Sequence, residues 1–213
     1  MEKGNWVEIK KKLQITLEEI FYNYDFQNLS NYEKRKIIFD FLCDNISYDY
    51  ELLNNIREFH TSKKQVSRNT FLELSSVINK KIGICNAISQ YYKLLLEEVG
   101  IISYCVICDD GTQVKHQLNL VYDDYHRTYS FDDVTSVIVK RGTNEEYFDY
   151  DLETANSFNQ GNAEVFKDKK WFILPEEYIN FLIGRDRKSD RRLEVLPNNI
   201  SSIKLKSNLN IRN

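Results

Sequence analysis

Proline and glycine are scarce in this chain. Two prolines and seven glycines occur among 213 residues, so no stretch has the composition of a low-complexity linker or a disordered tail. No apolar run approaches the roughly 18 residues that a membrane-spanning helix needs, and residues 1–5 lack the charged-then-apolar layout of a signal peptide. The sequence therefore predicts no membrane partner and, by default, a cytoplasmic location.

Cysteine and net charge are also low. Four cysteines are too few for a disulfide scaffold in a chain of this size, and without an export signal they are expected to stay reduced. The net charge of −3 lacks the excess of basic residues typical of nucleic-acid binding, and we interpret the basic run at 185–192 as solvated surface. The hydrophobic fraction of 42% is enough for the core of one ordinary domain.

Apolar residues recur at helical spacing along the N-terminal half of the chain. The repeats cover residues 6–24, 37–46, 74–78 and 88–99. Capping-box spacing precedes the second and third repeats, at Ser30 with Glu33 and at Thr70 with Glu73. The polar stretch 60–69 predicts a loop ahead of the third helix.

The fourth helix is predicted to begin at a cysteine. Gly83 precedes Cys85, and Gly100 suits a left-handed C-terminal cap. Strand-like segments follow at 101–108, 116–122 and 128–133, separated by turn residues. The pattern predicts an α+β fold in which N-terminal helices and the Cys85 helix pack on an antiparallel sheet.

The last third of the chain carries weaker signals. Residues 147–150 are compatible with an extended segment, and Pro175 followed by two glutamates favours a helix start. We interpret residues 1–138 as the core domain with its N-terminal helices. Residues 139–213 are interpreted as a C-terminal extension packed on the same domain.

Three residues have the chemical types and positions that nucleophilic catalysis needs. A helix N-terminus favours a thiolate because its unpaired N–H groups and dipole stabilise negative charge, and Cys85 is predicted there. His116, thirty-one positions later (116 − 85), begins a predicted strand that gives an imidazole base rigid support. Asp133 ends the neighbouring strand, where a carboxylate can accept the other imidazole N–H. Asp132 is the alternative acid, because adjacent strand residues face opposite sides of a sheet.

The surroundings of these residues resemble the transglutaminase-like superfamily, in particular its bacterial cysteine peptidase and acyltransferase domains. The family pattern is Gly-x-Cys at a helix start, a His-x-x-Asn strand, and a strand ending in Asp-x-Thr. This chain has Gly83-Ile84-Cys85, His116-Gln117-Leu118-Asn119 and Asp133-Val134-Thr135. The segment from Ile37 to Asp49 resembles the helix ahead of the family's catalytic core, so the resemblance spans roughly residues 30 to 138.

The resemblance implies a papain-like catalytic core with a triad of Cys85, His116 and Asp133. It implies acyl transfer on a peptide or amide substrate, with hydrolysis and transglutamination both open, and it requires no metal or organic cofactor. The family commonly has Ala-Trp where this chain has Gln117-Leu118, and a small residue soon after the cysteine. A catalytically inactive protein-interaction module on the same fold is the alternative.

The remaining cysteines and histidines have simpler interpretations. Cys105 and Cys108 form a Cys-x-x-Cys, but a zinc site needs about four ligands and the sequence has no second such pair, which favours packing in a strand. His60 falls in a predicted loop and His126 in a tight turn, so both are predicted to be surface residues. Nothing in the sequence indicates the oligomeric state.

Overall fold

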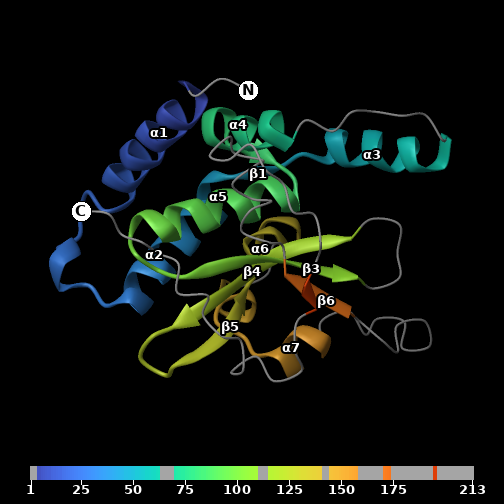
Figure 1. The fold of residues 1–213 in the computed structure, drawn as a ribbon. Coiled ribbons are helices and arrows are strands. Elements are labelled where there is room, and N and C mark those ends of the chain that lie inside the picture. Colours follow the sequence, from blue (N-terminus) through green and yellow to red (C-terminus); the bar gives the residue numbers. More distant parts are fainter. Residues whose placement is uncertain are drawn as a thin grey trace.

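The structure is a computed structural model that describes residues 4–62, 70–109, 115–140, 144–157, 170–173 and 194–195. In chain order, its elements (Figure 1) are α1 Gly4–Ile20, η1 Phe26–Asn28, α2 Asn31–Asn45, β1 Ser47–Tyr48, α3 Tyr50–Ser62, α4 Thr70–Lys80, β2 Ile82–Gly83, α5 Cys85–Glu98, β3 Ser103–Asp109, β4 His116–Asp123, β5 Thr128–Asp132, α6 Val134–Lys140, η2 Asn144–Tyr147, α7 Leu152–Ser157, β6 Lys170–Ile173 and β7 Glu194–Val195. None of these helices is long and apolar enough to cross a lipid bilayer.

An antiparallel sheet lies at the centre of the described chain. Its strand order is β5-β4-β3-β6-β7, and the consecutive strands β3, β4 and β5 form the predicted meander. Asn119 at the middle of β4 lies opposite Cys105 on β3 and Asp132 on β5. β6, from the predicted C-terminal extension, pairs with the other edge of β3. The division into core and extension stays a prediction.

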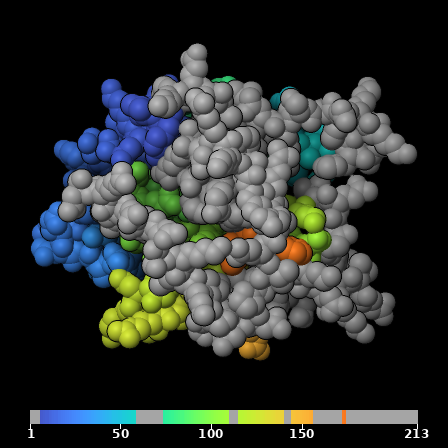
Figure 2. All heavy atoms as spheres, viewed as in Figure 1, coloured from blue at the N-terminus to red at the C-terminus, as the bar shows by residue number. Residues whose placement is uncertain are grey.

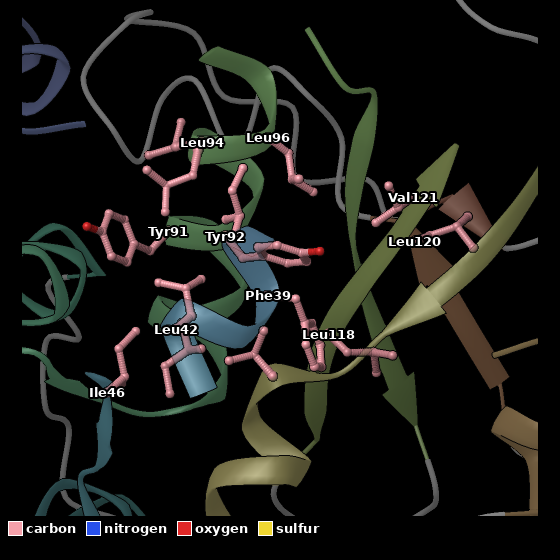
Figure 3. Packing of buried hydrophobic residues seen from close by; sticks show 14 of the residues in the cluster. Phe39, Leu42, Ile46, Tyr91, Tyr92, Leu94, Leu96, Leu118, Leu120 and Val121 are labelled. Carbon is pink, nitrogen blue, oxygen red and sulfur yellow. The ribbon is translucent and has the colours of Figure 1, made fainter. Parts of the chain in front are cut away.

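The core lies between α2, α5 and β4 (Figure 3). Phe39 and Leu42 of α2, Tyr92 of α5 and Leu118 of β4 are each at most 2% exposed. Burial of such large apolar side chains is the main term that stabilises the packing of helix against sheet. The helix α5 runs across the sheet (Figure 1). The predicted class of mixed helix and antiparallel sheet is therefore confirmed.

Helix α2 begins at the predicted capping box. Glu33 donates its backbone N–H to Ser30 Oγ at 3.2 Å, and Ser30 donates its backbone N–H to Glu33 Oε2 at 2.8 Å. The start of α2 lies beside the turn between β4 and β5 (Figure 2), where Asn31 donates to Asp124 at 2.7 Å. This helix start therefore joins the N-terminal layer to the edge of the sheet.

The structure corrects the sequence prediction of several elements. The predicted loop at 60–69 is wrong at its start, because α3 continues to Ser62 and includes the backbone of His60. The helix α6 was not predicted, because its seven residues are too few to establish an apolar period. Segment 147–150 is only partly extended, since η2 ends at Tyr147 and Tyr150 alone bridges to Phe131.

Some predictions fall outside the described residues. They concern the capping side chains of Thr70 and Glu73, the helix predicted from Pro175, and the basic run at 185–192. The Cys85 helix and its end are described and agree with the prediction. Gly100 has φ +82°, in the left-handed region that favours glycine at a helix end.

Gly83 allows α4 to approach the segment ahead of Cys85. A Cβ at this position would lie 2.2 Å from Val77 Cγ2, well inside van der Waals contact. We expect Gly83→Ala to lower the free energy of unfolding by about 1–3 kcal/mol, measured by chemical denaturation, and Val77→Ala in the same chain to restore part of the loss. Gly100→Ala is the control, since open space surrounds that position and only its backbone conformation is strained. A loss in Gly83→Ala that Val77→Ala leaves unchanged would contradict this account.

Candidate active site

Cys85 is the first residue of α5 and follows directly from a short parallel bridge. β1 pairs with β2 through Tyr48 and Gly83, two residues ahead of the cysteine. The N-cap residue Ile84 is extended, at φ −106° and ψ 173°, and makes no side-chain capping bond. The first N–H groups of a helix lack partners within the helix. Cys85, 8% exposed, is therefore placed where negative charge is stabilised.

His116 and Asp133 are hydrogen-bonded to each other. His116 Nε2 lies 2.7 Å from Asp133 Oδ2. The His116 imidazole is 31% exposed and the Asp133 carboxylate 6%. The imidazole therefore lies between the buried carboxylate and the solvent. His116 is the first residue of β4, and Asp133 follows the last residue of β5, its neighbour in the sheet. The pairing of the two strands therefore brings the residues together.

The thiol of Cys85 completes the arrangement. It is hydrogen-bonded to the side chain of His116 and accepts from the backbone N–H of Gln117. Because Nε2 of the imidazole faces Asp133, the nitrogen that faces the sulfur is Nδ1. The structure thus brings together all three residues that the sequence predicted. Their catalytic role stays a prediction.

The electrostatics of these groups favour a charged pair. Burial opposes ionisation of the Cys85 thiol, but the hydrogen bond and the positive charge of His116 outweigh it, so the pKa of Cys85 lies below its ordinary value. Burial also opposes a charged imidazole, yet the charge and hydrogen bond of Asp133 raise the pKa of His116 well above its usual range. Both shifts favour a thiolate beside an imidazolium over the neutral pair.

Asp133 has a second, structural task. It was predicted to end a strand, whereas β5 ends at Asp132 and Asp133 caps α6. Ser136 donates its backbone N–H to Asp133 Oδ1 at 2.9 Å and its hydroxyl to Oδ2 at 2.7 Å. Burial would raise the pKa of Asp133, but His116 and these Ser136 bonds lower it overall. The carboxylate is therefore charged and fixed in orientation.

The alternative acid, Asp132, belongs to a different cluster. It is completely buried and accepts two hydrogen bonds from Arg35, both at 2.7 Å. It also accepts from the Tyr92 hydroxyl at 2.8 Å and from the Asp149 backbone N–H at 2.9 Å. These four bonds occupy both carboxylate oxygens, so the geometry favours Asp133 as the partner of His116.

Comparison with known proteins supports the fold. No protein-family model matches the sequence, and no curated protein matches it. A solved structure described as the crystal structure of a TGase is similar, with a TM-score of 0.51 and 18% sequence identity. The similarity covers 65% of this chain and 34% of that one, so this chain spans about a third of the length of the TGase.

The fold is transglutaminase-like. At 18% identity the similarity establishes the fold alone, and the papain-like detail, the triad and the activity rest on the residues themselves.

Sequence reasoning did not consider Ser136, which contacts Asp133, or Tyr48, which pairs with Gly83 two residues ahead of Cys85. Burial raises the pKa of the Tyr48 hydroxyl, and negative charge on Cys85 and on Asp133 raises it further. The Tyr48 hydroxyl therefore stays protonated near neutral pH. The signal available in the sequence for Tyr48 was its place in Tyr48-Asp49, at the end of the segment from Ile37 to Asp49 that resembles the family. Two residues are too few to form a periodic pattern.

The other cysteines differ from Cys85. Cys105 and Cys108 are buried in β3, and no group of three or more His, Cys, Asp or Glu side chains in the described ranges is suited to hold a metal ion. Burial and the charges of Asp40 and Asp44 raise the pKa of Cys43. A raised thiol pKa makes a cysteine unreactive, so the four thiols are expected to differ widely in alkylation rate.

The remaining described histidine, His126, is a surface residue as predicted. Its side chain is 65% exposed, and Nδ1 lies 2.5 Å from Asp123 Oδ2 within the turn between β4 and β5.

Proposed function

We propose that this protein is a cysteine-dependent acyltransferase or hydrolase that acts on a peptide or amide. The observation that carries the proposal is the hydrogen-bonded series from Cys85 through His116 to Asp133, with the His116–Asp133 distance of 2.7 Å. A nucleophile, a base and a residue that orients the base are the parts that covalent acyl transfer needs. The transglutaminase-like fold is consistent with this chemistry.

In the first half of the reaction, the Cys85 thiolate attacks the carbonyl carbon of the substrate and the carbonyl oxygen takes the negative charge. His116, as imidazolium, then gives its proton from Nδ1 to the departing amine. The C–N bond breaks and a thioester to Cys85 remains. Asp133 holds the ring in place and stabilises its charge throughout.

The start of α5 offers hydrogen-bond donors to the oxyanion. The first backbone N–H groups of a helix lack partners within it, so those beside Cys85 can donate to the oxygen that takes the charge.

In the second half, an acceptor gives its proton to His116 and attacks the thioester, and Cys85 leaves as the thiolate. Water as the acceptor gives hydrolysis, and an amine gives a new amide. Both outcomes use the same three residues. A screen of peptide amides with and without added primary amine distinguishes them.

The proposal predicts the pH dependence of alkylation. Because the pKa of Cys85 is lowered, its reaction with iodoacetamide should have a midpoint below the ordinary thiol pKa of about 8.5 and slow only as pH falls through that lower value. At pH 7, peptide mass spectrometry should find Cys85 modified faster than Cys43, Cys105 or Cys108. Equal labelling of all four cysteines, or none at Cys85, contradicts the proposal and leaves the interaction module as the function.

A further inference from the structure

We propose that Gln117 is a positioning residue, whose side chain clamps the start of β4 to the first turns of α5 and so holds the Cys85 sulfur against His116. The inference rests on the proposed function. It concerns a position where the chain departs from the pattern that its sequence resembles, since Gln117 stands where a small residue is common.

The Gln117 side chain points to α5, and 94% of it is shielded from solvent. Its Nε2 donates to Ser89 Oγ at 2.7 Å and lies 3.4 Å from the backbone oxygen of Asn86. Ser89 Oγ in turn donates to the same Asn86 oxygen at 3.2 Å. Gln117, Ser89 and Asn86 thus form a closed ring of hydrogen bonds beside Cys85.

The direction of these bonds is determined by their chemistry. The Asn86 carbonyl can only accept, so the Ser89 hydroxyl that donates to it must accept from Gln117. The amide Nε2 of Gln117 is therefore the donor that starts the ring. A carboxylate at this position cannot donate and would carry negative charge close to the sulfur.

The backbone of the same residue holds the sulfur directly. The Gln117 N–H is a donor to Cys85, and His116 is the preceding residue of the strand. Movement of this part of β4 relative to α5 would therefore weaken the Gln117 and His116 bonds to the sulfur together. Two residues further along β4, Asn119 donates to the Ser89 carbonyl oxygen at 3.0 Å, a second contact that keeps the elements in register.

The test compares variants of the full chain that differ in this one donor. Gln117→Glu removes the donor and adds charge, Gln117→Met removes the donor at similar length, and Ser89→Ala removes its acceptor. The readouts are the rate at pH 7 and the pH midpoint of Cys85 alkylation by iodoacetamide. Circular dichroism verifies folding, and Gln27→Glu on the exposed 3₁₀ helix η1 is the matched control for added charge.

We expect Gln117→Glu to slow the alkylation about tenfold and to move its midpoint to higher pH, which is the effect of about one pKa unit. Gln117→Met and Ser89→Ala should each slow it about threefold, and the double variant should be no slower than either, because both act through one bond. Gln27→Glu should match the wild type.

The failure of this inference differs from the failure of the proposed function. A reactive wild-type Cys85 with an unchanged midpoint in folded Gln117→Glu overturns the clamp and leaves the function standing. If Gln117→Glu does not fold, wild-type rates in Gln117→Met and Ser89→Ala overturn it. An unreactive wild-type Cys85 overturns the proposed function itself.

Discussion

Replacing His116 by alanine is expected to slow the alkylation of Cys85 at pH 7 by at least about tenfold and to lower acyl transfer by about 10²- to 10⁴-fold. Without the imidazolium, burial raises the pKa of the thiol, and an ordinary cysteine is only about a few per cent thiolate at pH 7. The Asp133 charge nearby opposes ionisation further. Mass spectrometry of timed iodoacetamide reactions measures the first effect, and turnover of a peptide amide the second.

One variant serves as a control for this experiment, and a second tests the role of Asp133. His126→Ala removes an imidazole that is also paired with an aspartate but lies at an exposed turn, and it should leave both rates unchanged. Asp133→Asn keeps an oxygen that can cap α6 and removes the charge beside His116, so it should lower activity with little loss of stability. Wild-type alkylation in folded His116→Ala would refute the thiolate–imidazolium pair.

The second large effect concerns stability. Asp132→Asn should lower the free energy of unfolding by up to about 3–5 kcal/mol, because it removes the completely buried carboxylate that pairs with Arg35 and leaves this guanidinium paired with Asp149, which is 30% exposed. Burial by itself would lower the pKa of Arg35, but Asp132 raises it overall, which shows how strongly the pair is coupled. Urea unfolding followed by circular dichroism gives the loss.

The control for this prediction is an exposed pair. Glu8→Gln breaks the ion pair of Glu8 with Lys12, in which Glu8 is 64% exposed, and should cost no more than about 1 kcal/mol. Removing both buried charges, as Arg35→Met with Asp132→Asn, should recover part of the loss. Equal losses from Asp132→Asn and Glu8→Gln would contradict this account and would mean that the existing ion pair of Arg35 with Asp149, at 3.0 Å, is enough to stabilise the buried charge.

The sequence predicted those features that depend on residues close together in the chain. The capping box at Ser30 and Glu33, the helix that starts at Cys85 and the meander of β3 to β5 each depend on spacings within a few residues. Such spacings report which side chains face the core and which satisfy a helix end. They were sufficient to place Cys85 and His116 on the correct elements.

Features that depend on distant pairing could not be predicted. Arg35 binds Asp132, 97 residues later, whereas a basic residue between Lys34 and Lys36 on an amphipathic helix is otherwise typical of solvent exposure. β6 is four residues long and is defined by its pairing with β3. α3 was missed for a different reason, since Leu52, Leu53 and Ile56 have helical spacing within a few residues and the pattern was overlooked. The Asp-x-Thr spacing favoured Asp133 over Asp132 as the partner of His116, and in the structure Asp133 contacts His116 whereas Asp132 contacts Arg35.

The cap that Asp133 provides for α6 affects how relatives of this chain should be judged. A lineage that abandoned the chemistry could change its cysteine without losing a helix cap, whereas changing the aspartate would remove the cap of α6. Selection for a folded protein alone would then preserve the carboxylate long after turnover had ceased. If the proposed function is correct, retention of Cys85, rather than of Asp133, therefore distinguishes catalytically active relatives from inactive ones.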